Sequence, residues 1–233
     1  MSYDEFDAWE EAAHAAMFEG FIEDPGARDH FYEVLYDEIV EDFTGSRLRS
    51  FLEKEPNVAT PALEALGEAR GFHNTHNTAA FIFAAIAAEV GLQSLLFKPV
   101  VYGLVHAESA ASLITKLALA NRDEGFTKIL LRLLAAHGGV DILNHSRSAS
   151  TKSIWQEFLL VRTKRNRIVH QAEAASAEEA EIAISVASCI IDELFPLMVK
   201  KLGLFLHGHT VRDVPEEVFS ASLSPFSNPS RAE

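Results

Sequence analysis

The stretch NTAAFIFAAIAAEVGLQSLLF, residues 77–97, is a long apolar run rich in alanine. Its length would suffice to cross a bilayer, but Glu89 near its middle would cost roughly 2.5–3.5 kcal/mol there, and alanine favours insertion weakly. We therefore predict a buried core helix that Lys98-Pro99 ends, because the residue before a proline disfavours the helical conformation. We expect Glu89 to be partly buried with a hydrogen-bond partner; the alternative is that it faces a cleft.

Helical patterns continue on the carboxyl side of this run. Ser153 with Gln156, and Ser176 with Glu179, form two capping boxes, which are start signals for helices. Pro196 is expected to kink or break the last helix. No strand pattern, internal repeat or long heptad pattern is present, so the sequence predicts an all-α fold built as an antiparallel helical bundle. The expected helices span residues 99 or 108 to 120, 123–136, 153–169 and 177–202.

The charge is distributed unevenly along the 233 residues. Residues 1–69 contain 18 acidic and 4 basic side chains, whereas residues 70–233 contain 16 of each, so the whole net charge of −14 is amino-terminal. Prolines and glycines between residues 55 and 71 indicate a boundary. We predict an acidic amino-terminal helical extension over residues 1–70, a helical bundle over residues 71–206, and a disordered carboxyl-terminal tail over residues 207–233.

Within the acidic extension, residues 4–21 and 28–52 have the apolar spacing of amphipathic helices. These two helices are expected to form a hairpin with an acidic outer surface. One interpretation is a solvated face that keeps the protein soluble. The other is a surface that docks a protein partner such as an antitoxin, or that covers the protein's own site.

Composition limits the class of protein. A hydrophobic fraction of 48% is typical of a globular chain. Cys189 is the single cysteine and has no partner for an internal disulfide, which favours a reducing, cytoplasmic location. The acidic amino terminus lacks the basic start of a signal peptide, and we expect no membrane association.

A basic run with an arginine, an amide and a histidine lies near the predicted end of the 153–169 helix. Its residues are Arg162, Lys164, Arg165, Asn166, Arg167 and His170. On a straight helix, Arg165 and His170 would point about 140° apart and lie about 7.5 Å apart along the axis. We therefore predict that the helix loosens near His170, before the capping box at Ser176, so that the two side chains can meet.

This pattern resembles the R-x(4–6)-H motif of HEPN domains, over roughly residues 76–205. The resemblance implies a helical bundle of HEPN type in which the motifs of two protomers meet across a dimer, and in which many members cut RNA without a metal. It implies Arg165, Asn166 and His170 as catalytic residues, and a toxin or defence effector as the biological role. The spacing recurs at Arg132 and His137, without a polar residue after the arginine.

The residue types suit this chemistry. RNA supplies its own nucleophile, the ribose 2′-OH, so cleavage needs a proton acceptor and a cation beside the phosphorane. His170 can transfer protons near neutral pH and Arg165 offers a permanently charged fork to phosphate oxygens. The basic neighbours Arg162, Lys164 and Arg167 are predicted to hold the RNA backbone.

An alternative remains open, namely a non-catalytic helical module that binds RNA or a nucleotide, or that braces a dimer. Histidines at positions 73, 76, 207 and 209 are not joined by a recognisable set of metal ligands. We therefore expect no metal and no cofactor.

Overall fold

The computed structural model describes residues 44–120, 124–148 and 150–213. The chain divides into two compact units, residues 1–43 and residues 44–233, and all of the described residues belong to the second unit. The predicted helix 4–21, most of the predicted helix 28–52 and the tail beyond residue 213 lie outside the described residues.

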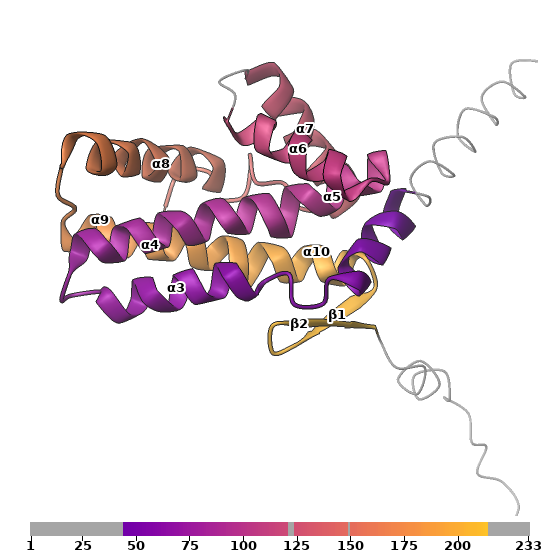
Figure 1. Ribbon diagram of the computed structural model, residues 1–233, viewed down its shortest axis with the longest axis horizontal. Helices are drawn as coiled ribbons and strands as arrows, with labels where there is room; N and C mark the ends of the chain where they lie inside the picture. The colour runs from indigo at the N-terminus through magenta and orange to yellow at the C-terminus, as the bar shows by residue number, and fades with distance from the viewer. Residues whose placement is uncertain (1–43, 121–123, 149, 214–233) are drawn as a thin grey trace, which may run out of the picture. The chain divides into compact units, whose positions relative to one another are not determined.

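The described part of the second unit is mostly helical, with one two-stranded sheet (Figure 1). This agrees with the predicted all-α class at its coarse level. Residues 44–54 are helical. The elements after them are α3 (Thr60–Phe72), α4 (Asn77–Val90), η1 (Gly91–Phe97), α5 (Lys98–Val105), α6 (Glu108–Ala120), α7 (Glu124–Gly138), α8 (Ile154–Gln171), α9 (Ala177–Ser188), η2 (Cys189–Leu194), α10 (Phe195–Lys201), β1 (Leu204–His207) and β2 (Thr210–Asp213).

The predicted helix end at Lys98-Pro99 is wrong, because α4, η1 and α5 follow one another without interruption. The segment η1 is a π-helix in which the Lys98 N–H donates to the carbonyl of Gln93, five residues back. A π-helical turn does not use the bond from residue i to residue i−4, so the missing N–H of Pro99 costs less here than inside an α-helix.

The same solution occurs at Pro196, where a break was predicted. The π-helix η2 precedes it, and the Phe195 N–H donates to the carbonyl of Ile190. The helix therefore continues through the proline to Lys201. Each of the two long helices therefore continues through a proline, because a π-helical turn lies just before that residue.

The two π-helices touch each other in the core. A Cβ placed on Gly91 would lie 3.0 Å from Cγ2 of Ile190, so any larger residue here would require the Ile190 side chain to shift. Alanines of α4, among them Ala80, Ala84 and Ala88, are fully buried where α4 packs against α3 and α9. The alanine-rich run that suggested a core helix is therefore confirmed as one.

Two composite helices, Asn77–Val105 and Ala177–Lys201, are long and apolar enough to cross a membrane. Their most apolar windows are 61% and 56% buried inside the protein, as expected for core helices. Length and composition are therefore weak evidence for a membrane span.

The predicted boundary at residue 70 is wrong within the described chain. Leu66 and Ala69 of α3 are fully buried, as are Leu48 and Leu52 of the helical residues 44–54. The helix α3 packs against both α4 and α9. The helical residues 44–54 and α3 therefore share one core with α4 and α9, because prolines and glycines mark turns between packed helices as well as turns between domains.

The predictions of no strand and of a disordered tail from residue 207 are also wrong as far as Asp213. Strands β1 and β2 pair in antiparallel register from Leu204 with Asp213 to His207 with Thr210. Leu204 and Val211 are buried, and the Val211 N–H donates to the Pro56 carbonyl at 2.9 Å. Four-residue strands show too few alternations to be recognised in a sequence.

Candidate functional site

The helix α8 carries every residue that the sequence assigned to the site. Its predicted capping box at Ser153 and Gln156 is confirmed, as is the one at Ser176 that begins α9. The prediction that the helix loosens near His170 is wrong, because α8 stays regular to Gln171 and ends at Ala172 with φ 54°. Arg165 and His170 therefore keep the separation of about 140° that a straight helix imposes.

Arg165 lies on the side of α8 that faces α4. Its side chain is 32% exposed, and Nη2 lies 3.7 Å from Oε2 of Glu89, an ion pair longer than a hydrogen bond. Its Nη1 donates to Oδ1 of Asn166 at 3.1 Å. Glu89 is 30% exposed, so it is partly buried as predicted, with a cation rather than a close hydrogen bond as its partner.

His170 lies on the outer side of α8, and its side chain is exposed. Among the described residues it makes no hydrogen bond or ion pair. Within one chain the structure therefore does not bring Arg165 and His170 together.

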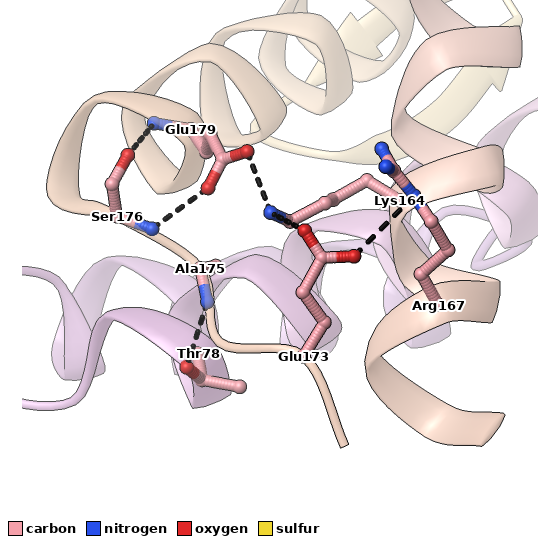
Figure 2. A network of polar contacts seen from close by, with 7 residues as sticks. All are labelled: Thr78, Lys164, Arg167, Glu173, Ala175, Ser176 and Glu179. Carbon is pink, nitrogen blue, oxygen red and sulfur yellow. Dashed lines mark hydrogen bonds and ion pairs between the residues drawn. The ribbon is translucent and has the colours of Figure 1, made fainter. Parts of the chain in front are cut away.

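Lys164 holds the end of α8 to the start of α9 (Figure 2). Its Nζ lies 2.6 Å from Glu173 and 2.7 Å from Glu179, and its side chain is only 11% exposed. Hydrogen bonds to Glu173 and then to Glu179 raise the pKa of Lys164. The hydrogen bond from Lys164 lowers the pKa of Glu179, which also closes the α9 capping box. Lys164 is therefore already paired with two glutamates of the same chain, which argues against its predicted role in binding RNA.

The other two predicted substrate residues differ from each other. Arg167 is half exposed, and its Nε lies 3.4 Å from Oε2 of Glu173 (Figure 2). Arg162 is half-buried and makes no hydrogen bond or ion pair within the described part of the chain. Arg167 and Lys164, but neither Arg165 nor His170, line a surface hollow of about 250 Å³ whose apolar wall includes Leu160 and Ile182.

A buried ion pair, whose Glu157 lines this hollow, was not predicted. Arg147 binds both carboxylate oxygens of Glu157, at 2.6 and 2.7 Å, with side chains 14% and 7% exposed. Burial, the largest single influence, would raise the pKa of Glu157, but hydrogen bonds from Arg147 and Ser150, together with the charges of Arg147 and Lys152, outweigh it and the pKa is lowered. Arg147 lies in the connection before α8, so no helical spacing in the sequence indicates this contact.

A second unpredicted group combines three kinds of metal ligand. Ligand atoms of His145, Cys189 and Glu193 lie within 4.8 Å of one another. None of the four histidines considered from the sequence belongs to it. The sequence offered no signal, because His145 is 44 positions before Cys189.

Comparison with protein-family models, with curated proteins and with solved structures gave no match. The resemblance to HEPN domains therefore depends on the motif in α8 alone.

Proposed function

We propose that this protein is a metal-independent endoribonuclease that acts as a homodimer through the carboxyl-terminal half of α8. The observation that carries the proposal is the state of two side chains on that helix. His170 is exposed and without a partner in the described chain, and Arg165 is only loosely paired at 3.7 Å. Both groups are therefore available to a phosphate, unlike Lys164.

The geometry of a regular helix supports the proposed dimer. Arg165 and His170 of one chain point about 140° apart, so one chain cannot apply both to the same phosphate. A second α8 packed alongside can place its His170 near the first chain's Arg165. Leu159 lies about 20° from His170 around the helix, and its large apolar side chain is 40% exposed, which favours a partner on this face.

The proposed reaction uses the ribose of the substrate. His170 accepts the proton of the 2′-OH, and the oxygen attacks the adjacent phosphorus. The bond from phosphorus to the 5′ oxygen breaks, and that oxygen takes a proton back from His170. Arg165 stabilises the charged phosphorane, and Asn166 orients Arg165 through its hydrogen bond. The products are a 2′,3′-cyclic phosphate and a 5′-hydroxyl. The cellular setting that we propose is a cytoplasmic toxin or defence effector.

The direct test is cleavage of single-stranded RNA by the full chain in EDTA. His170→Ala and Arg165→Ala should each abolish cleavage, because each removes one of the two required groups. The matched controls are Arg132→Ala and His209→Ala, which remove exposed side chains of the same types elsewhere. Cleavage that persists in folded His170→Ala protein would refute the catalytic assignment.

Mixing the two inactive variants tests the composite site. A heterodimer of Arg165→Ala and His170→Ala chains contains one site with both groups intact and one with neither. Activity should therefore reappear on mixing and exchange of subunits, up to about a quarter of the wild-type value: half of randomly mixed dimers are hybrids, and each hybrid has one of two sites. Failure of any activity to reappear, with hybrid dimers demonstrated by native mass spectrometry, would exclude a site shared between chains.

A second candidate is a dimeric assembly or RNA-binding module without cleavage. It is favoured by the neutralisation of the basic run, since Lys164 and Arg167 face Glu173 and Arg165 faces Glu89. A stable dimer that leaves RNA intact in the same assay would support it. The acidic residues 1–43, with 14 acidic and one basic side chain, are proposed as the docking surface for a protein partner such as an antitoxin.

A further inference from the structure

The group formed by His145, Cys189 and Glu193 offers nitrogen, sulfur and oxygen ligands at one place. Nε2 of His145 lies 3.8 Å from Oε2 of Glu193, and all three ligand atoms lie within 4.8 Å of one another. Tetrahedral Zn²⁺ with bonds of about 2.0–2.3 Å needs ligand atoms roughly 3.3–3.8 Å apart. Side-chain shifts of about 1 Å therefore suffice to close the set around one ion.

His145 is positioned by its own backbone. Its N–H donates to the carbonyl of Asp141 at 2.9 Å, and its carbonyl accepts from Ile154 N–H at 2.9 Å. The Asp141 carboxylate accepts hydrogen bonds from the backbone of Leu143 and Asn144, which closes the turn before His145. The imidazole is thus held on a loop tied to the start of α8.

The other two ligands come from the π-helix η2. Cys189 is its first residue and Glu193 follows four positions later, close to one turn on, so both side chains point to the same side. Cys189 is 1% exposed, whereas the side chain of Glu193 is 60% exposed. The thiol therefore closes the inner end of the group and the carboxylate stands at its open, solvent side.

One polar group here is left unsatisfied by the protein alone. Nε2 of His145 is buried and has no hydrogen-bond partner, which is costly for a ring nitrogen. The nearby Arg147 is already bound on both carboxylate oxygens of Glu157, so its charge is largely offset.

We propose that His145, Cys189 and Glu193 bind one Zn²⁺ ion, with a water molecule as the fourth ligand. The mixed nitrogen, sulfur and oxygen set suits Zn²⁺ and excludes Mg²⁺ and Ca²⁺, which take oxygen ligands. Binding releases the Cys189 proton to solvent and leaves a thiolate on the metal. The ion fastens the loop before α8 to η2.

The test is metal titration of the full chain after treatment with a chelator. Calorimetry with Zn²⁺ should show one equivalent bound per chain. Co²⁺ should produce a thiolate-to-metal charge-transfer band in the near ultraviolet together with the intense visible bands of tetrahedral coordination. Glu193→Gln and His145→Ala should each weaken binding at least about tenfold, since even loss of an outer-shell partner costs roughly 10–100-fold. The matched control His209→Ala removes an exposed histidine from the turn between β1 and β2 and should leave the affinity unchanged.

Glu193→Gln is the safest variant for folding because its side chain is mostly exposed, whereas Cys189→Ser changes a buried residue. Cys189→Ser should abolish the charge-transfer band. The proposal is overturned if wild-type protein binds no stoichiometric Zn²⁺, if the Co²⁺ spectrum lacks the thiolate band, or if folded Glu193→Gln and His145→Ala proteins bind like the wild type. It is independent of the ribonuclease proposal, because the readout is metal binding and His170 takes no part in it.

Discussion

The two sides of α8 differ in how their polar side chains are used. On the side that packs against the rest of the described chain, Glu157 binds Arg147, and Lys164 binds Glu173 and Glu179 at hydrogen-bond distances. On the outer side, the histidine of the motif is exposed and without a partner among the described residues. A basic run in a sequence is therefore not one surface. Its inward members hold the fold together, and its outward members remain free to bind.

The largest effect is expected at the buried pair. Glu157→Gln removes the carboxylate and leaves the Arg147 charge, 14% exposed, without its partner. The free energy of unfolding should fall by about 3 kcal/mol, the low end for a broken buried pair. Urea unfolding followed by circular dichroism measures it.

The matched control for this change is Glu181→Gln, which makes the same substitution on an exposed residue of α9. It should alter the free energy of unfolding by no more than about 0.5 kcal/mol. Equal effects of the two substitutions would mean that the Arg147–Glu157 pair contributes no more than a surface contact.

The next largest effect is expected from acid pH, which should weaken the contacts on the inner side of α8. The pKa values of Glu157 and Glu179 are both lowered from 4.5, so their stabilisation is present above that value and is lost as pH falls through their folded pKa values. The melting temperature should therefore drop below about pH 4.5. The difference between wild type and Glu157→Gln should shrink over the same range; a constant difference down to about pH 3 would contradict the assignment.

Lys164→Met and Arg162→Met separate the two roles within the basic run. Lys164 is committed to two glutamates, whereas Arg162 has no ion pair in the described residues. We expect Lys164→Met to lower the urea midpoint more than Arg162→Met does. The decrease should still be smaller than the one caused by Glu157→Gln. RNA affinity should respond in the opposite order, by electrophoretic mobility shift at low salt. Greater loss of RNA binding in Lys164→Met would restore Lys164 as a substrate residue.

The smallest effect on stability is expected on the outer side. His170→Ala removes an exposed side chain without contacts in the described chain, so the free energy of unfolding should change by no more than about 0.5 kcal/mol. The same substitution should abolish RNA cleavage. Thermal unfolding and the cleavage assay on one preparation measure both, and a large loss of stability would give His170 a structural role instead.

Local sequence signals determined much of the fold. The capping boxes at Ser153 and Ser176 placed two helix starts correctly, because the bonds that satisfy the first turn of a helix come from residues three positions apart. The apolar run of residues 77–97 was correctly assigned to the core, because its alanines and its single charge do not suit a bilayer. The coarse all-α class followed from such periodicities.

Only the tertiary structure decided the rest, because the responsible contacts join residues that are distant in sequence. Gly91 meets Ile190 where the two π-helices touch, and this packing accompanies the passage of both long helices through their prolines. Lys164 is occupied by glutamates of the following loop and helix, which no charge count could show. His145 reaches Cys189 and Glu193 through a loop closed by backbone hydrogen bonds. Sequence by itself determined which side chains α8 carries; packing determined which of them are already in use.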